Sequence, residues 1–284
     1  MSVVVGIIVG AVTVLFLRVA GRDMLTMPAL ARTNYRGYPL PTAGGVLIVL
    51  AVLVIEAGRA VLGAAGVGED PGLTLSRSLV LFAAFGFGFL GFVDDLLGTG
   101  PDRGFRGHVR ALAQGRLTTG FLKLFGGAGV AVVLVATPGF ATGRRLITDA
   151  VLIALAANFA NLLDLAPGRL VKASWVAYVP LAVALGTDDI GIAVAPIMGA
   201  ALGLLPDDLR ENLMLGDTGA NVIGATLGLG VVIGLGSTAR TSVLVALIVL
   251  NVLAEVLSFS RVIDRVGFLR TFDRLGQRPE RRQA

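Results

Sequence analysis

Long apolar stretches separated by short polar segments dominate this chain. Nine of them have the roughly 15–20 residues that a helix needs to cross the hydrocarbon core of a bilayer. They cover residues 2–20, 44–62, 77–93, 121–137, 147–163, 173–186, 190–205, 218–236 and 241–257. The pattern therefore predicts an all-α, polytopic integral membrane protein with about nine transmembrane helices.

The composition supports the same class. Of 284 residues, 55% are hydrophobic and 15% are charged, which is typical of membrane proteins and not of soluble domains. The first apolar stretch lacks a cleavage site of small residues, so we interpret it as a membrane span and not as a signal peptide. The absence of cysteine excludes disulfides and thiolate sites, and a single histidine excludes a metal site made of several histidines. No nucleic-acid partner is expected.

The basic residues predict the orientation. Of the 24 Lys and Arg residues, 19 lie on the side that holds segments 21–43, 94–120, 164–172, 206–217 and the tail. The other 5 are Arg59, Arg77, Arg144, Arg145 and Arg240. Because basic residues are retained in the cytoplasm, the N-terminus is predicted outside and the C-terminus inside. All the chemistry-bearing polar segments then face the cytoplasm.

Two adjacent carboxylates, Asp94 and Asp95, end the third apolar stretch. An Asp at the centre of a bilayer costs about 2.5–3.5 kcal/mol, so the pair belongs at an interface or in a polar cavity. Neighbouring carboxylates repel each other and are good ligands for a hard divalent cation. The alternative is a helix end that carries polar residues without a function.

A second polar cluster ends the fifth apolar stretch. Asn158, Asn161 and Asp164 recur every three residues, which places them in one sector of a helix about 120° wide. Pro167 and Gly168 then break the helix. Two basic residues follow, Arg169 and Lys172. This face suits a polar ligand or the water shell of a metal, and interhelical hydrogen bonding is the alternative.

The first cytoplasmic loop contains Arg36 and leads through Thr42 to Gly44 and Gly45. Prolines exclude a helix there, and the two glycines permit a tight turn into the second span. An ordinary Pro/Gly connection would have the same composition. The loop is therefore a candidate substrate contact on position alone.

Asp217 opens the eighth apolar stretch between two glycines, with Asn221 one turn later. Glycine lets a ligand or another backbone approach closely. The alternative is structural, because Asp is a preferred N-cap residue.

Two basic segments complete the cytoplasmic side. The second loop carries Arg103, Arg106, His108, Arg110, Arg116 and Lys123, and it either attracts phosphate or only sets the topology. Residues 258–284 predict a cytoplasmic amphipathic helix after a transmembrane catalytic domain of residues 1–257. Its arginines form i, i+4 pairs: Arg261 with Arg265, and Arg270 with Arg274. The tail either anchors at the interface or recognises phosphate.

The acidic residues share one setting, since Asp94, Asp95, Asp164 and Asp217 all lie at cytoplasmic ends of spans. Convergent carboxylates need a cation, and oxygen-only ligands favour Mg²⁺, with Mn²⁺ as a substitute. A Mg²⁺ site that faces basic loops and opens to lipid suits phosphoryl chemistry between a soluble pyrophosphate donor and a lipid acceptor.

Four polar segments also match, in order, the motifs of a known family: Pro41–Gly45, Gly91–Asp95, Asn158–Asp164 and Leu215–Gly219. The chain resembles the polyprenyl-phosphate N-acetylhexosamine-1-phosphate transferases, which include the phospho-N-acetylmuramoyl-pentapeptide transferases. Two departures mark a divergent member. Leu165-Ala166-Pro167-Gly168-Arg169 stands where the family usually has Asp-Gly-x-Asp-Gly, and the tail has no histidine motif.

The resemblance implies a phosphoglycosyl transferase in the bacterial inner (plasma) membrane. It would move a sugar-1-phosphate from a UDP-sugar to undecaprenyl phosphate and release UMP, with Mg²⁺, as the first membrane step of a cell-envelope glycan pathway. Asp217 is then the metal ligand, and the catalytic residues are Asp94, Asp95 and Asp164. The predicted substrate-binding residues are Arg36, Thr42, Gly44, Gly45, Asn158, Asn161, Arg169, Lys172, Asn221, Arg261 and Arg265.

Other classes stay open. A transporter or lipid flippase would also hold intramembrane polar residues, but it should carry charge at the midplane. A catalytically idle scaffold would keep the spans and could lose the donor motif. A CDP-alcohol phosphotransferase is disfavoured, because its Asp-Gly-x-x-Ala-Arg pattern is absent. The transferred sugar is undetermined, and a homodimer is compatible with the sequence.

Overall fold

The computed structural model describes residues 2–34, 36–68, 72–98, 115, 118–136 and 143–278. Of the basic residues predicted in the second loop, Lys123 is described, whereas Arg103, Arg106, His108, Arg110 and Arg116 lie outside the described residues.

The described chain is almost entirely helical. Its helices are α1 (Val3–Ala20), α2 (Arg22–Leu25), α3 (Val46–Ala64), α4 (Leu75–Leu97), α6 (Thr119–Val135), α7 (Arg144–Leu163), α8 (Arg169–Leu185), α9 (Asp189–Leu209), α10 (Gly216–Gly234), α11 (Ser237–Val256), α12 (Phe259–Arg265) and α13 (Gly267–Arg274), with a 3₁₀ turn η1 (Pro28–Leu30). Two short strands, β1 (Ala31–Thr33) and β2 (Pro39–Pro41), form an antiparallel hairpin.

Each predicted span coincides with one long helix. Among the described residues, seven helices are long and apolar enough to cross a membrane, namely α1, α3, α4, α7, α9, α10 and α11. The helices α6 and α8 have 17 residues each, so the count of nine crossings stays a prediction. The chain is a multi-pass, all-α membrane protein.

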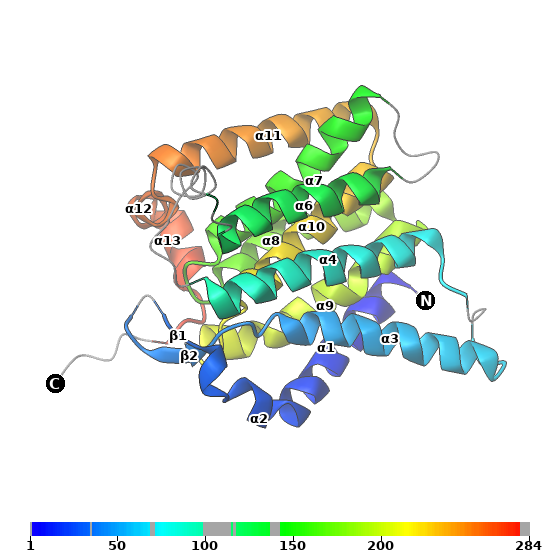
Figure 1. Cartoon of the computed structure of the whole chain (residues 1–284), viewed down its shortest axis with the longest axis horizontal. Coiled ribbons are helices and arrows are strands. Elements are labelled where there is room, and N and C mark those ends of the chain that lie inside the picture. The colour runs from blue at the N-terminus through cyan, green and yellow to red at the C-terminus, as the bar shows by residue number, and fades with distance from the viewer. Residues whose placement is uncertain are drawn as a thin grey trace.

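Helix α10 lies near the centre of the bundle, packed against α4, α7 and α9 (Figure 1). Most residues of α9 and α10 are buried, whereas Leu247 is the one buried residue of α11, which lies at the periphery. Glycines allow the close packing. A Cβ on Gly45 would overlap the backbone of Gly219, and one on Gly91 would overlap that of Asp217.

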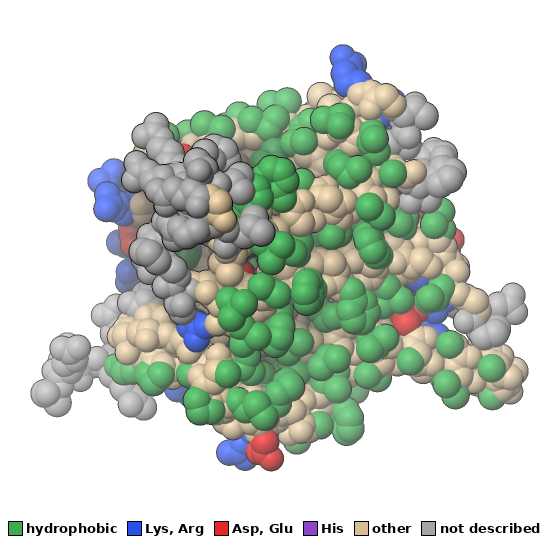
Figure 2. Space-filling view, viewed as in Figure 1, with side chains coloured by type: hydrophobic (Ala, Val, Ile, Leu, Met, Phe, Trp, Pro, Cys, Tyr) green, Lys and Arg blue, Asp and Glu red, His purple; other side chains and the backbone are tan. Residues whose placement is uncertain are grey.

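The bundle surface is largely apolar. In Figure 2, hydrophobic side chains cover the middle of the visible face, and the charged side chains lie towards its edges. Exposed side chains include Phe16, Phe89, Val183 and Val256. Such a surface is costly in water and favourable in lipid, which agrees with the predicted class.

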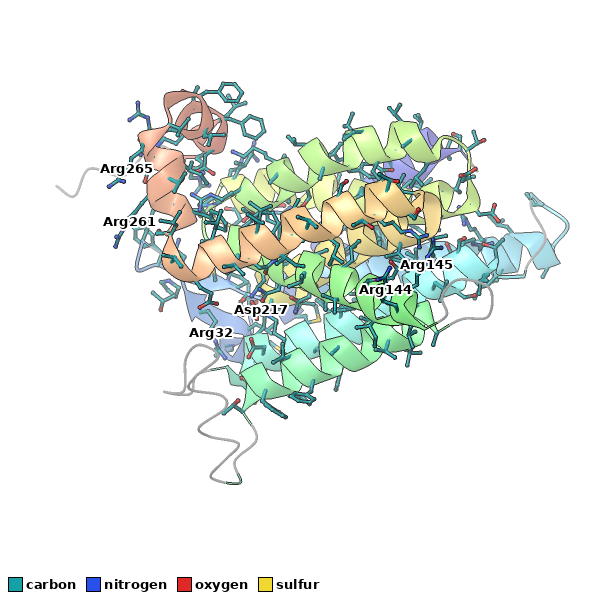
Figure 3. The ribbon with its side chains drawn as sticks, turned by 90° about the horizontal axis from the view of Figure 1, so that it is seen from above. Arg32, Arg144, Arg145, Asp217, Arg261 and Arg265 are labelled. Atoms are coloured by element: carbon teal, nitrogen blue, oxygen red, sulfur yellow. The ribbon has the colours of Figure 1, made fainter. Side chains whose placement is uncertain are left out.

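The hairpin and the tail helices α12 and α13 lie at the same end of the bundle (Figure 1). Asp217 also lies towards that end, whereas Arg144 and Arg145 lie towards the opposite one (Figure 3). The tail is not one continuous helix, so that prediction was wrong. Val266 has φ −96° and ψ 107°, which is extended backbone, and Gly267 follows it as the start of α13.

Candidate functional site

The two adjacent carboxylates at the end of α4 have different surroundings. Asp95 is buried, and its oxygens accept from the N–H of Thr218 (2.9 Å), the hydroxyl of Thr218 (2.6 Å) and the N–H of Asp217 (3.0 Å). Helix α10 has no capping side chain at its own N-cap residue. Asp95 therefore caps α10 from a neighbouring helix.

The alternative predicted for Asp217 was that it caps its own helix, α10. Asp95 does this capping instead. The Asp217 carboxylate instead forms an ion pair with the ammonium of Lys123. When the Asn161 amide is oriented to satisfy both neighbours, its nitrogen donates to Asp217 Oδ1 (2.6 Å) and its oxygen accepts from Lys123 Nζ (2.9 Å). Asp94 Oδ2 lies 3.9 Å from the same Nζ. We call Asp94, Lys123, Asn161 and Asp217 the ammonium cluster.

Lys123 was predicted only as one of the basic residues of the second loop and not as a site residue. It is the fifth residue of α6. It is also one of two lysines among the 24 basic residues. A rare lysine near the start of an apolar helix is a signal that the sequence did contain.

A cavity of about 400 Å³ adjoins the cluster and is strongly acidic. Its ionisable lining residues are Asp95, Asp164, Asp208, Glu211 and Asp217. Burial raises the pKa of Asp164 well above its ordinary value, and the nearby carboxylates of Asp208, Asp217 and Asp95 raise it further. The cavity therefore favours a cation, or protonation of one of its acids.

Asp208 was also missed, although Asp207 and Asp208 form an adjacent acid pair at the end of an apolar stretch, like Asp94 and Asp95. Asp207 pairs with Arg18 and accepts from the Asn212 amide (2.9 Å). Asp208 Oδ2 accepts from the N–H of Gly168 (2.8 Å). The criterion that found the first acid pair would have found this second one.

The arrangement is compatible with Mg²⁺. The described residues hold no group of three or more acidic or histidine side chains placed to bind a metal ion. Mg²⁺ is usually held by one or two protein carboxylates, with waters and substrate phosphates completing its shell. Asp217 and Asp94 supply such a pair, and the Asn161 amide oxygen lies beside them.

The first-loop residues contact the beginning of α10. The Thr42 hydroxyl donates to Asp95 Oδ1 (3.3 Å). The N–H groups of Gly44 and Gly45 donate to the carbonyls of Met214 and Leu215, each at 2.9 Å. Their contacts therefore orient the segment that carries Asp217, while their predicted substrate contacts stay predictions.

Arg36 reaches the same end from the hairpin. Its Nε lies 3.3 Å from Glu211 Oε1, and it lines a second cavity of about 550 Å³. Three more arginines, Arg169, Arg274 and Arg278, line this second cavity, and we call it the basic cavity. The cavity beside the ammonium cluster is the acidic cavity. The acidic and basic cavities share two lining residues, Leu165 and Ala166.

The predicted face of Asn158, Asn161 and Asp164 is divided. Asn158 donates to the Asn251 side chain of α11 (2.7 Å), whereas Asn161 contacts Asp217 and Asp164 lines the acidic cavity. A step of three residues turns a helix by about 60°, which is enough to face a different neighbour. Asp164 also lies beyond the end of α7, so helical spacing does not determine its direction.

Asn221 is buried in α10, with 2% of its surface exposed. Neither polar atom of its amide has a hydrogen-bond partner within the described part of the chain. Such a group is costly in an apolar core, so it is a candidate for contact with water or ligand.

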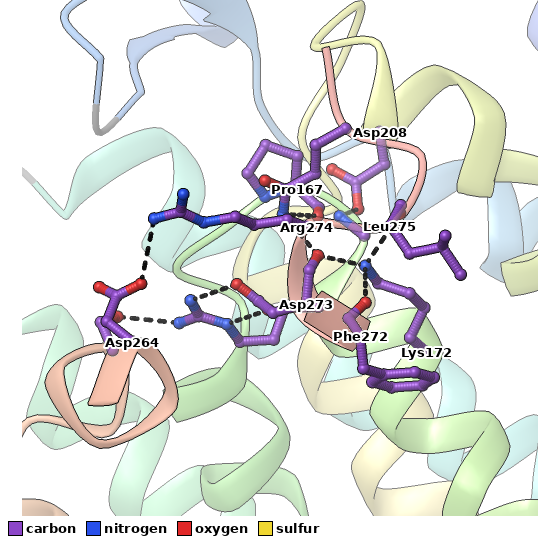
Figure 4. A network of polar contacts seen from close by, with 12 residues as sticks. Pro167, Lys172, Asp208, Asp264, Phe272, Asp273, Arg274 and Leu275 are labelled. Carbon is purple, nitrogen blue, oxygen red and sulfur yellow. Dashed lines mark hydrogen bonds and ion pairs between the residues drawn. The ribbon is translucent and has the colours of Figure 1, made fainter. Parts of the chain in front are cut away.

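The remaining basic candidates are divided between the tail interface and solvent. Arg169 forms a two-pronged ion pair with Asp273 of α13 (2.8 and 3.0 Å). The ammonium of Lys172 donates to the carbonyls of Phe272 (3.0 Å), Asp273 and Leu275 (3.2 Å) at the end of α13 (Figure 4). These two residues hold the tail against the bundle. Two tail arginines, Arg261 and Arg265, are exposed at its outer edge (Figure 3).

No family model matches the chain, but comparison with known proteins finds several similar ones. The chain is similar to phospho-N-acetylmuramoyl-pentapeptide-transferases from several bacteria. The protein from Deinococcus radiodurans is 32% identical over 199 residues, which cover 65% of this chain and 59% of the relative. The chain is similar to these transferases, at identities that mark it as divergent from them.

Two further members give the same result over a longer region. The transferase of Oceanobacillus iheyensis is 27% identical over 258 residues, covering 80% of this chain and 72% of the relative. That of a Geobacillus species is 25% identical over 244 residues, covering 80% and 71%. The matched region of this chain thus spans between about three fifths and three quarters of these members of the family. The resemblance predicted from the four motifs is confirmed.

Proposed function

We propose that this protein transfers a sugar-1-phosphate from a UDP-sugar to a polyprenyl phosphate, with undecaprenyl phosphate as the acceptor, and releases UMP. The reaction would depend on Mg²⁺ and form the first membrane step of a cell-envelope glycan pathway in the bacterial inner (plasma) membrane. The observation that carries the proposal is the ammonium cluster. It joins three motif segments of a known transferase family at one end of an apolar bundle.

The residues have distinct roles in this reaction. Asp217 and Asp94 would hold Mg²⁺, which when bound would neutralise charge on the diphosphate of the donor. Asp95 keeps the first turn of α10 in place through its three hydrogen bonds, so Asp217 stays directed at the cluster. The basic cavity offers Arg36 and Arg274 to donor phosphates, because guanidinium groups bind phosphate oxygens in pairs.

A transporter is not favoured, because a transport site usually lies near the middle of the membrane. The acids of this site lie at helix ends instead: Asp94 and Asp95 in the last turn of α4, and Asp217 in the first turn of α10. A site at one end of the bundle suits a reaction between a water-soluble donor and a lipid headgroup.

The test uses the full chain purified in detergent, with undecaprenyl phosphate and a panel of UDP-sugars, and it measures UMP. We expect UMP release with one of the UDP-sugars. This release should require undecaprenyl phosphate and should be lost with EDTA or in Asp217→Asn. Asp188→Asn, an exposed acid beside the first turn of α9, at the far end of that helix from Asp208, is the matched control and should release UMP normally. If folded protein releases no UMP with any donor, the proposal is wrong.

A further inference from the structure

The ammonium of Lys123 occupies the position where the acids of the cluster converge. It forms an ion pair with Asp217, lies 3.9 Å from Asp94 and donates to the Asn161 oxygen (2.9 Å). These three neighbours come from α10, α4 and α7, and the lysine itself comes from α6. One cationic atom thus connects four helices at the point where oxygen ligands gather.

The identity of the residue supports a role as a stand-in for a metal ion. An ammonium is a compact point charge with three donors, whereas guanidinium is a planar fork. Of the 24 basic residues in this chain only Lys123 and Lys172 are lysines, and the nitrogen of each lies beside three oxygen atoms, at up to 3.9 Å for Lys123. The cluster therefore offers a monovalent cation the kind of oxygen surroundings that a hard metal ion prefers.

Lys123 sits there despite a local cost. Only 18% of its side chain is exposed, and burial disfavours a charged group. Without a cation, Asp94 and Asp217 would face each other as like charges in a partly buried place. The ammonium of Lys123 offsets one of these two negative charges.

We propose that Lys123 is an internal counter-ion at the divalent-cation site, and that Mg²⁺ binds by displacing its ammonium from Asp217 and Asp94. The inference rests on the proposed function, because it takes these carboxylates as the metal ligands. A divalent ion and an ammonium that bound the same two carboxylate oxygens would lie only a few ångströms apart. Because two cations repel each other strongly at that distance, they do not bind these oxygens together. Metal binding therefore frees Lys123, and removal of the metal returns it.

The first consequence concerns affinity. Lys123→Met removes the competing charge and keeps an unbranched side chain, so Mn²⁺ should bind at least ten times more tightly in the absence of donor and acceptor. Lys172→Met makes the same change at the tail interface and should leave Mn²⁺ affinity as in the wild type. Free Mn²⁺ measured by electron paramagnetic resonance on detergent-purified full chain gives the dissociation constants. Equal affinity in Lys123→Met and the wild type would overturn the inference.

The second consequence needs no substitution. The chain has two lysines, so mass spectrometry can follow acylation of each side chain by an amine-specific reagent. Saturating Mg²⁺ should increase labelling of Lys123 several-fold, since the displaced ammonium loses its partners, while Lys172 serves as the internal control. Labelling of Lys123 that Mg²⁺ leaves unchanged or decreases would refute displacement.

These outcomes are separable from those of the proposed function. If UMP release requires Mg²⁺ but neither Mn²⁺ affinity nor Lys123 labelling changes as expected, the counter-ion inference alone fails. If Mg²⁺ exposes Lys123 but no UDP-sugar yields UMP, the cation site stands and the transferase proposal fails.

Discussion

The adjacent acids Asp94 and Asp95 allow a sharp test of which carboxylate is structural. The perturbation is Asp95→Asn, which keeps the shape of the side chain and removes its charge. Asp95 accepts three hydrogen bonds from the first turn of α10, and each hydrogen bond to a charged group contributes about 1.5–3 kcal/mol. The amide keeps one acceptor oxygen but turns an N–H group towards donors. We expect a loss of about 2–4 kcal/mol of stability.

Asp94→Asn is the matched control. It makes the same chemical change one residue earlier, where the carboxylate is 3.9 Å from Lys123 and part of its surface is exposed. A partly exposed ion pair at this distance contributes less than about 1 kcal/mol. Each variant is expected to lose transferase activity under the proposed function, but only Asp95→Asn should also lose stability.

Thermal unfolding of the full chain in one detergent measures the difference. For chains of this size, about 1 kcal/mol shifts the melting temperature by roughly 2 °C. Asp95→Asn should therefore melt about 4–8 °C below the wild type, and Asp94→Asn within about 2 °C of it. Thr218→Val, which removes one of the three donors, should add little destabilisation to Asp95→Asn because the two changes break the same contact. Equal melting temperatures for the two aspartate variants would refute the capping role.

Three other expectations follow from the structure. Gly45→Ala should prevent folding or cost more than about 3 kcal/mol, because its Cβ would overlap a neighbouring backbone, whereas Gly58→Ala has open space and should melt normally. Asn158→Leu should keep UMP release, since the interhelical hydrogen bond it loses is worth about 0.6 kcal/mol, whereas Asn161→Leu should abolish it; similar activities would contradict the division of this face. The raised pKa of Asp164 means that the folded state keeps a proton that the unfolded state has lost. Metal-free protein should therefore lose stability as pH rises from the ordinary pKa of an aspartate to the raised pKa of Asp164. The melting temperature should fall less with pH in Asp164→Asn than in the wild type; an equal fall would contradict the raised pKa.

Several features of the site needed more than the pattern of residues. Lys123 and Asp217 are 94 residues apart in the chain, and no local spacing predicts that they meet. The break in the tail helix at Val266 was also missed. Apolar residues keep their helical spacing across Val266, although the backbone there is extended and not helical. Arg169 and Lys172 were expected to contact substrate from their position after the helix break, but they bind a tail that returns from about 100 residues further on.

The sequence by itself determined the membrane class, the position of each long helix and the four polar segments that meet at one end of the bundle. These features are local, since length and hydrophobicity over about 20 residues decide where a helix can cross a membrane. Only the tertiary structure decided which of the two adjacent acids, Asp94 or Asp95, caps α10 and which lies in the ammonium cluster. Successive residues on a helix point about 100° apart, so the packing of α4 against α10 turns Asp95 to the helix terminus and leaves Asp94 beside Lys123.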